Sequence, residues 1–592
     1  MSPTTSRLIR GGEWLLNSSD PASVLTPERV TEEHRLIART VSDFVNSEVL
    51  PVLDRLEQKD WALARQLVRR AGALGLLGVD VAEMYGGEAL DKVTSMLVSE
   101  RMSRSASFGA TFGAQANLTI LPLSLFGTEV QKRKYLGKLL SGETIGAYGL
   151  SEPGSGSDAL GAKTRAARQP DGSFVLNGEK MWTTNGGFAD LFIVFAKVDG
   201  EHFTAFIVER AFPGVTSGKE EHKMGLHGSS TTPVILQDVR VPAENVLGEV
   251  GKGHKIAFNV LNFARFKLGA ACGGGARDAI GEAARYALER RQFGQPIASF
   301  GAIKHKLGEM VVRAYAVESL LYRTGGMIDD RIASIPHEPA DQSAALSAFE
   351  EYAIEASIAK VAGSEMLDFV LDENIQIHGG NGYVRDYPAE RHYRDARVNR
   401  IFEGTNEINR LLIPDRLARR ALKGDLPIVA AAKALQQELT TPPPSATLGD
   451  HALAEERRQV EAFKKATLMV FARAMHTYGE RLNDEQEVLT GVADMLIDVY
   501  ASESAVLRAA ASPGPSPKKA ALHVAAARVF VSDAGSRLDA CGREALAAMA
   551  EGGALETALE ALGRLLTTVP INTVKLRREI ADETTTRGAY PF

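Results

Sequence analysis

At 592 residues, of which 44% are hydrophobic and 24% charged, the chain is expected to form roughly three or four packed units of a soluble globular protein rich in helix. Its 68 Lys and Arg residues against 74 Asp and Glu residues give a formal net charge of -6, which argues against nucleic-acid binding. Two cysteines, Cys272 and Cys541, exclude a disulfide framework and a multi-cysteine metal site, so we expect no metal and a reducing compartment.

The first 20 residues contain no continuous apolar run, because Glu13 interrupts the only candidate, and a secretory signal is therefore not expected. No stretch reaches about 18 uninterrupted apolar residues, so a membrane-spanning helix is not expected either. We predict a cytoplasmic protein if the source is bacterial, or an organelle-matrix protein if it is eukaryotic. A peripheral contact with the inner membrane stays open.

From about residue 26 to residue 140 the apolar spacing is helical. Between residues 32 and 50, for example, Leu36, Val41 and Phe44 follow the pattern of one buried helix face. Further helices are predicted over 91–102 and 130–140.

Short runs rich in β-branched and aromatic residues come next, separated by turn signals such as Pro170-Asp171-Gly172. No long helix separates these runs, which predicts an antiparallel β domain of about 100 residues. The predicted strands cover residues 145–150, 173–177, 191–196, 203–208 and 232–241.

Helical periodicity then returns and persists to the end of the chain. Helices are predicted over 254–289, 302–328, 344–373 and 403–422, with a loop over 329–339, and then over 454–481, 485–511, 518–534 and 554–566. Proline-rich breaks are expected at 441–444 and 512–517. The predicted units are an N-terminal segment (1–27), an N-terminal helical domain (28–144), a middle β domain (145–250), a C-terminal helical domain (251–424) and an extra helical domain (425–592).

A glycine-rich stretch at residues 154–159 matches the loose dinucleotide pattern G-x-G-x-x-G/A. Pro153 precedes it, Asp158 would bring negative charge to a pyrophosphate, and no βαβ unit surrounds it. We therefore interpret this stretch as a turn that closes a strand.

Five motifs carry more information together than any one of them alone. They lie at residues 148–158, 180–187, 288–294, 376–383 and 391–408, the last of which contains Ile401-Phe402-Glu403-Gly404-Thr405-Asn406-Glu407-Ile408. In this order and spacing they resemble the acyl-CoA dehydrogenase family over roughly residues 30–425. With residues 261–266 and the C-terminal extension, the chain looks most like the very-long-chain branch.

The resemblance implies a mainly helical α+β fold: an N-terminal helical domain, a middle β-barrel-like domain, a C-terminal four-helix bundle and an additional helical domain. It also implies FAD-dependent α,β-dehydrogenation of a fatty acyl-CoA to the trans-2-enoyl-CoA, with Glu403 as the catalytic base. Burial beside Ile401 and Phe402 is expected to raise the pKa of Glu403 toward that of the substrate. Gly404 would let the thioester approach the backbone closely.

The same resemblance assigns the remaining site residues motif by motif. FAD would be bound by Tyr148, Leu150, Ser151, Trp182, Thr183, Thr184, Arg290, Gln292, Phe293, Gln376, Gly379, Gly380, Thr405 and Glu407. The acyl-CoA would be bound by Ser157, Asn262, Arg265 and Gly404. Arg394 and Asp395 are expected to form a structural ion pair.

Residues 117–121, Asn-Leu-Thr-Ile-Leu, are bulkier than the glycines expected there in very-long-chain relatives. They are expected to shorten the acyl pocket, which favours medium-to-long acyl substrates.

The resemblance further implies an electron-transfer flavoprotein as electron acceptor and an oligomer, because in the family Arg290 and its neighbours reach FAD across a subunit boundary. The C-terminal extension, which in long-chain relatives favours dimers over tetramers, implies a homodimer. Two alternatives stay open: an acyl-CoA oxidase that uses O2, and a flavin-binding scaffold whose C-terminal domain recruits a partner. In that domain, residues 520–531 could form a buried helix face or a surface that contacts a membrane or a partner.

Overall fold

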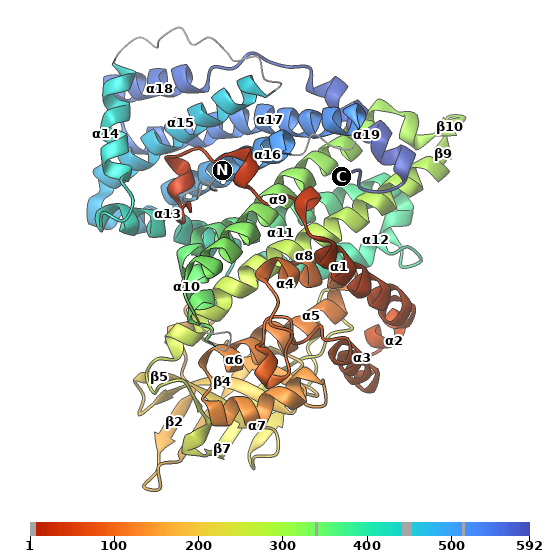
Figure 1. Cartoon of the computed structure of the whole chain (residues 1–592), viewed down its shortest axis with the longest axis vertical. Coiled ribbons are helices and arrows are strands. Elements are labelled where there is room, and N and C mark those ends of the chain that lie inside the picture. The colour runs from red at the N-terminus through yellow and green to blue at the C-terminus, as the bar shows by residue number, and fades with distance from the viewer. Residues whose placement is uncertain (1–7, 338–340, 441–452, 512–515) are drawn as a thin grey trace, which may run out of the picture.

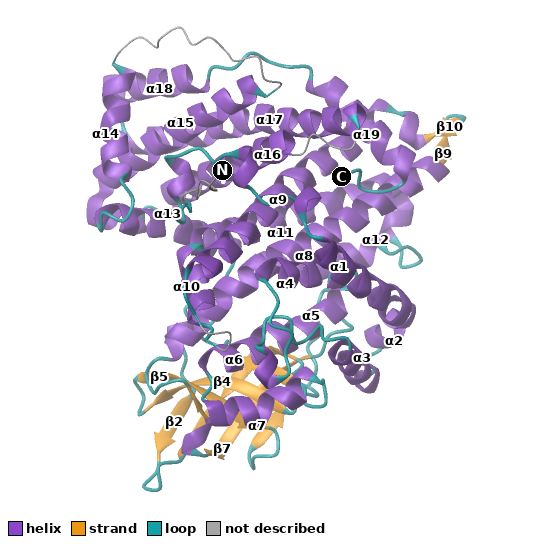
Figure 2. Cartoon of the chain, in the orientation of Figure 1, coloured by secondary structure: helices purple, strands orange, loops and turns teal. Residues whose placement is uncertain are grey.

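The computed structural model describes residues 8–337, 341–440, 453–511 and 516–592. Figure 1 shows a β domain at one end of the molecule, a layer of long helices in the middle and a second helical layer at the other end. Figure 2 shows that strands are concentrated in the β domain, apart from one small hairpin at the opposite corner. The predicted mainly helical fold with one middle β domain is confirmed.

The N-terminal helical domain begins at a capped helix. The Thr31 side chain accepts a hydrogen bond from the His34 N–H and the His34 ring accepts one from the Thr31 N–H, which fixes the start of α1. The helices are α1 (Glu32–Phe44), α2 (Leu53–Glu57), α3 (Trp61–Ala73), α4 (Lys92–Met102), α5 (Ala106–Gln115), α6 (Leu121–Phe126) and α7 (Glu129–Leu140). Wider π turns follow α1 and α5, at η4 (Val45–Val49) and η7 (Ala116–Ile120).

The β domain is one eight-stranded sheet, with the order β6-β7-β3-β2-β4-β5-β8 and β1 paired to β4. Its strands are β1 (Gly146–Gly149), β2 (Arg165–Arg168), β3 (Phe174–Thr184), β4 (Leu191–Val198), β5 (His202–Glu209), β6 (Val215–Ser217), β7 (Thr231–Val241) and β8 (Val246–Leu247). The prediction of a purely antiparallel domain is wrong, because β1 and β2 both pair with β4 in parallel. Local sequence shows where strands lie but not which of them become neighbours.

The middle layer contains four long helices, three of which pack against one another while the fourth, α13, packs against α11. They are α8 (Gly253–Glu289), α9 (Gly301–Ser334), α11 (Ala353–His378) and α13 (Asn406–Leu422), accompanied by α10 (Ser343–Glu351), α12 (Ala389–Ala396) and the hairpin β9–β10 (Arg291–Gln292, Gln295–Pro296). The loop predicted over 329–339 begins too early, because α9 continues to Ser334. The single helix predicted over 344–373 is divided at Tyr352.

The extra domain adds α14 (Ile428–Leu439), α15 (Ala454–Tyr478), α16 (Gln486–Ala511), α17 (Pro517–Met549), α18 (Gly552–Leu566) and α19 (Thr573–Arg587). α14 and α19 were not predicted. Leu522, Ala525 and Val529 of α17 are buried, in agreement with the predicted buried face. The proline run at 441–444 lies outside the described residues, as do four residues of the break at 512–517. A membrane contact through this domain stays a prediction, and in the described chain no helix is long and apolar enough to cross a bilayer.

Ion pairs of one buried arginine join the extra domain to the bundle and to the start of the N-terminal helical domain. Arg508 of α16 is 1% exposed, and its guanidinium donates to Glu28 at 2.6 Å and to Glu318 of α9 at 2.7 Å. The Tyr590 hydroxyl also donates to Glu318, at 2.9 Å. We call Glu28, Glu318, Arg508 and Tyr590 the interdomain cluster.

Candidate active site

Glu403 lies in a strained turn directly before α13. Its φ is 57° and that of Gly404 is 77°, so two consecutive residues adopt the left-handed conformation. This conformation costs a residue with a side chain roughly 1–2 kcal/mol. The Arg265 Nε atom donates to the Glu403 carbonyl at 3.2 Å, and Asn409 Nδ2 donates to the Gly404 carbonyl at 2.9 Å. Strain that neighbouring residues maintain in this way is typical of functional sites.

The electrostatic environment makes Glu403 a stronger base than an ordinary carboxylate. Burial raises the pKa of Glu403 to about 7, while the positive charges of Arg265 and Lys360 act in the opposite direction. A carboxyl group with a pKa near the working pH is well matched to abstract a proton. The expected rise in the pKa of Glu403 is therefore present in the structure.

A cavity of about 210 Å³ extends from Glu403 into the helical layer. We call it the deep cavity. Phe402, Glu403 and Thr184 line one end, and α8 forms one wall through the small or apolar residues Ala264, Leu268, Ala271 and Gly275, which recur at helical spacing. From Ala264 to Asp278 this wall extends about 21 Å at 1.5 Å per residue. Such a long, narrow and mostly apolar space fits an extended hydrocarbon chain.

The opposite wall of the deep cavity comes from α5 and is built of small residues: Gly109, Ala110, Gly113 and Ala114. The π turn η7 then places Asn117 and Leu118 on the same wall. These two bulkier residues do not end the cavity, because its lining continues to Asp278 and Leu371. Their expected effect on the length of the acyl pocket stays a prediction.

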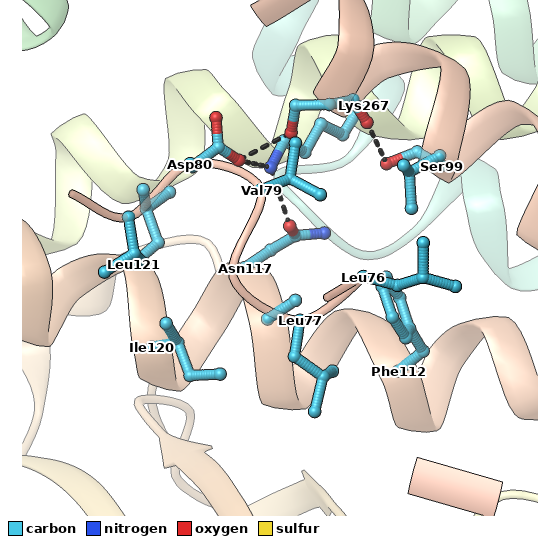
Figure 3. A pocket seen from close by; sticks show the side chains of 14 residues that line it. Leu76, Leu77, Val79, Asp80, Ser99, Phe112, Asn117, Ile120, Leu121 and Lys267 are labelled. Atoms are coloured by element: carbon cyan, nitrogen blue, oxygen red, sulfur yellow. Dashed lines mark hydrogen bonds and ion pairs between the residues drawn. The ribbon is translucent and has the colours of Figure 1, made fainter. Parts of the chain in front are cut away.

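A buried polar group borders the deep cavity at Asn117 (Figure 3). The Lys267 amine donates to Asn117 Oδ1 at 2.9 Å and is paired with the Asp80 carboxylate, to which Lys92 also donates at 2.7 Å. Behind it lies a much smaller void of about 10 Å³ lined by Leu76, Phe112 and their neighbours. Because the Asp80 carboxylate holds both lysines in place, this group forms a fixed wall of the deep cavity.

The β domain brings two of the predicted cofactor residues to the Glu403 end: Thr184 of β3 lines the deep cavity and Tyr148 of β1 lies near the carboxylate. Four more predicted residues lie beside these two in the sequence: Leu150, Ser151, Trp182 and Thr183. Tyr148 lies close enough to Glu403 for that carboxylate to raise the phenol pKa further, beyond the rise caused mainly by burial. The Tyr148 hydroxyl and the Thr183 Oγ1 atom are buried without a hydrogen-bond partner. Trp182 has a φ of 53° and is 58% exposed. Unpartnered polar atoms beside an exposed indole fit a flat ligand with polar edges.

The other predicted cofactor residues of the bundle lie far from Glu403, at the opposite end of α8 (Figure 1). They are Arg290, Gln292, Phe293, Gln376, Gly379 and Gly380, all exposed. The helix rise places Arg290 about 37 Å along α8 from Arg265. A Cβ atom at Gly379 or Gly380 would meet nothing within 4 Å, so a ligand can approach that backbone. One copy of the chain does not bring both groups to one small ligand.

Of the remaining predicted residues, Thr405 and Asn262 make hydrogen bonds within the protein, whereas Glu407 and Ser157 are exposed. Thr405 caps α13 by accepting from the Ile408 N–H, and Glu407 is exposed in the first turn of that helix. Ser157 is exposed in the turn after β1. Asn262 is buried and accepts a hydrogen bond from Arg265, so it holds Arg265 in place.

The predicted ion pair between Arg394 and Asp395 is wrong. Arg394 pairs with Glu390 at 2.6 Å, one helical turn earlier, while Asp395 accepts a hydrogen bond from the Leu226 N–H at 2.6 Å. Adjacent residues on a helix point in different directions, whereas residues four apart share a face.

Sequence reasoning missed Asn409 and Lys360, which both act on the turn at Glu403. Asn409 Nδ2 donates to the carbonyls of Gly404 and Thr405, and Lys360 donates to the side chain of Asn406. A lysine within the apolar stretch Ile358-Ala359-Lys360-Val361 was the available signal, because buried lysines are rare. Within the described residues, no group of three or more His, Cys, Asp or Glu side chains is arranged to hold a metal ion.

Four family models match the chain. They describe the N-terminal domain (residues 31–143), the middle domain (147–239) and the C-terminal domain (251–418) of acyl-CoA dehydrogenases, and a further acyl-CoA dehydrogenase C-terminal domain (462–564). A probable acyl-CoA dehydrogenase of Bacillus subtilis (strain 168) is 46% identical over 98% of both chains. The human mitochondrial very long-chain specific acyl-CoA dehydrogenase is 41% identical over 61% of this chain and 53% of its own.

A solved structure extends the similarity to three dimensions. An acyl-CoA dehydrogenase from Bacillus anthracis, complexed with FAD, superimposes with a TM-score of 0.96 at 47% identity. The match covers 98% of this chain and all of that one, so it includes the extra domain.

Proposed function

Because this chain belongs to the acyl-CoA dehydrogenase family, we propose that Glu403 is the base that removes an α-proton from a bound fatty acyl-CoA. The protein is an FAD-dependent acyl-CoA dehydrogenase. The observation that carries the proposed role is the position of Glu403, with its raised pKa, at one end of the deep cavity.

The residues at the Glu403 end fit FAD. Tyr148, Thr183 and Trp182 offer polar atoms without partners and an exposed aromatic face, as the edge and face of a flavin ring require. Bound FAD supplies the acceptor for the hydride that leaves the β-carbon. Arg290 would supply positive charge to the pyrophosphate, and Gly379 and Gly380 would let it approach the backbone.

The chain's own groups then have distinct tasks. The apolar deep cavity removes the acyl chain from water and holds the α-carbon at Glu403. The Glu403 carboxylate accepts the α-proton. The N–H of Glu403 makes no hydrogen bond within the described residues, so it is available to donate to the thioester oxygen as negative charge develops there. Arg265 and Asn409 hold the turn that presents both groups.

We further propose medium-to-long acyl chains as substrates, because the deep cavity continues well past Asn117 and Leu118 between two walls of small residues. Gly109→Leu is expected to lower kcat/KM for palmitoyl-CoA at least about tenfold and to leave butyryl-CoA almost unaffected. The Leu side chain displaces distal methylenes, and each buried methylene contributes about 0.8 kcal/mol. A Cβ at Gly109 meets nothing closer than 3.5 Å, so the helix tolerates the change.

Gly137→Leu is the matched control for this variant. Gly137 is an exposed glycine of α7 with nothing within 4 Å of an added Cβ, far from the deep cavity. Steady-state kinetics with a panel from butyryl-CoA to stearoyl-CoA provide the measurement. Equal losses for all chain lengths would contradict the proposed placement of the acyl chain.

We propose that two copies of the chain complete each FAD site, because Arg290 and Arg265 lie about 37 Å apart along one helix. Each of the variants Arg290→Ala and Glu403→Gln is expected to be inactive alone. When both are co-expressed, mixed dimers contain one site with Glu403 from one copy and Arg290 from the other, and this site is expected to recover up to about half of the activity per mixed dimer.

Dual affinity tags isolate the mixed dimers, and sedimentation velocity confirms their stoichiometry. Mixed dimers as inactive as the separate variants would show that each site is built within one copy.

The electron acceptor we propose is an electron-transfer flavoprotein. The test is anaerobic reduction of a purified electron-transfer flavoprotein by the enzyme and palmitoyl-CoA. Rapid hydrogen peroxide formation in air, without reduction of that protein, would identify an oxidase instead.

A further inference from the structure

We propose that Lys360 is a positioning residue for the base: it anchors the turn that carries Glu403 and compensates the burial of the ionised carboxylate. This inference rests on the proposed role of Glu403 and assigns a function to a residue of α11 outside the five motifs.

Lys360 reaches the turn through Asn406. Its side chain is completely buried, and its amine donates to Asn406 Oδ1 at 2.6 Å. Asn406 is the first residue of α13, two residues after Gly404, and its Nδ2 atom donates to Glu365 at 2.9 Å. Ser364 Oγ makes a second contact with Asn406 Oδ1, at 3.2 Å. Through these bonds α11 fixes the start of α13 and thus the turn before it.

The amine of Lys360 has an unusual environment for a buried cation. Among the described residues no carboxylate lies within ion-pair distance of it, and its hydrogen bond goes to a neutral amide. Burial lowers the pKa of Lys360 to about 8. Its surroundings contain the Cys272 thiol, Glu403, Arg265 and Glu407. Of the two carboxylates, Glu407 is exposed, so the low-dielectric interaction is the one with Glu403.

The charged groups around Glu403 support the same role for Lys360. Arg265 of α8 and Lys360 of α11 are its cations, and the neutral phenol of Tyr148 in β1 lies on the third side. Arg265 is itself buried, and burial lowers its pKa to about 10. Both cations are protonated at neutral pH, so both favour the ionised form of Glu403, which is the form that abstracts a proton. Removing either charge should raise the pKa of Glu403 further.

Four variants separate anchoring from charge. Lys360→Met removes both the hydrogen bond and the charge, whereas Lys360→Gln keeps a donor for Asn406 without the charge. Lys360→Arg keeps the charge. Ser364→Ala removes a hydrogen bond to Asn406 and leaves the charge of the site unchanged.

The first measurement is the pH dependence of kcat/KM with octanoyl-CoA on the holoenzymes. Lys360→Met and Lys360→Gln are expected to move the acidic limb, which reports ionisation of Glu403, upward by on the order of one pH unit. Lys360→Arg is expected to return the limb close to its wild-type position, and Ser364→Ala is expected not to move it.

The second measurement follows Glu403 without turnover. An acyl-CoA with sulfur at the β-position cannot be dehydrogenated, yet its α-protons can exchange with D2O, which NMR detects. The pH at which exchange begins should shift in the same variants and in the same direction. Thermal melting and flavin absorbance report folding and FAD content.

The outcomes distinguish this inference from the proposed function. Profiles of Lys360→Gln and Lys360→Met that overlay the wild type would overturn the role of Lys360, even if the variants melt earlier. If Lys360→Met fails to fold, Lys360→Gln and Lys360→Arg decide the question. If the wild type does not exchange α-protons, or Glu403→Gln exchanges them normally, the proposed role of Glu403 fails instead.

Discussion

Glu403→Gln is expected to lower the rate of acyl-CoA dehydrogenation by on the order of 10⁴-fold while FAD stays bound, because the amide keeps the shape of the carboxyl group but cannot accept the α-proton. Stopped-flow recording of flavin bleaching under anaerobic conditions measures the rate, and the flavin absorbance of the purified variant measures FAD content. Glu249→Gln, the same change at an exposed loop residue, is the control. A Glu403→Gln enzyme with normal bleaching would remove Glu403 from the mechanism.

The same variant is expected to be more stable than the wild type at pH 8. The pKa of Glu403 is about 7 in the fold and 4.5 as the ordinary value, so the folded state holds its proton more tightly. As pH rises from 4.5 to 7 the wild type loses stability, on the order of 3 kcal/mol, and above pH 7 the loss is complete. Gln has no proton to lose. The melting temperatures of the two holoenzymes should therefore diverge between pH 5 and pH 7.

Arg508→Ala is expected to destabilise the fold by about 3–5 kcal/mol, because it removes a buried cation that two carboxylates of the interdomain cluster share. Glu318 retains Arg277 at 2.8 Å but loses Arg508, and Glu28 loses its bidentate partner. Urea unfolding of the holoenzyme, followed by circular dichroism, provides the measurement. Arg133→Ala, at a side chain 65% exposed, should shift the midpoint little.

The pH dependence of the Arg508→Ala deficit adds an independent check. Despite its burial, which acts in the opposite direction, Arg508 lowers the pKa of Glu28 to about 2. A lowered carboxyl pKa stabilises the fold above pH 4.5, and this stabilisation disappears as pH falls toward 2. The difference between wild type and variant should therefore narrow on acidification. A constant difference would mean that lost packing, and not charge, causes the destabilisation.

Much of the fold could be predicted because local signals agree with it. Asp91 caps α4 through the Thr94 N–H, and Gly253–Glu289 carries helical periodicity over its entire length. The parallel pairing of β1 with β4 could not be predicted, because it depends on contacts between strands about 45 residues apart in the sequence. The predicted end of α9 lies too early, because Asp329 and Asp330 resemble the start of a polar loop. In the structure Asp329 instead accepts hydrogen bonds from the N–H groups of Lys92 and Val93.

The candidate site, too, could be predicted only in part. The motif around Glu403 identified the base, but the two consecutive positive φ angles and the hydrogen bonds from Arg265 and Asn409 are three-dimensional facts. The deep cavity could not be predicted either. Its walls combine small residues of α5 and α8, two helices that lie about 150 positions apart in the sequence, and neither helix alone shows that it faces the other. The sequence shows the bulk of Asn117 and Leu118, but only the structure shows that the π turn η7 places both residues in a side wall of the deep cavity.

The interdomain cluster can form only late in synthesis of the chain, and folding cannot be completed before it forms. Glu28 and Arg508 are separated by 480 positions, so a segment that leaves the ribosome early receives its partner only after most of the polypeptide has been made. At a synthesis rate of about 5–20 residues per second, Trp14 and Glu28 stay without their final neighbours for roughly half a minute or longer. Such distant pairings form slowly. The nascent chain thus leaves Trp14 and Glu28 without these contacts until most of the polypeptide has been made.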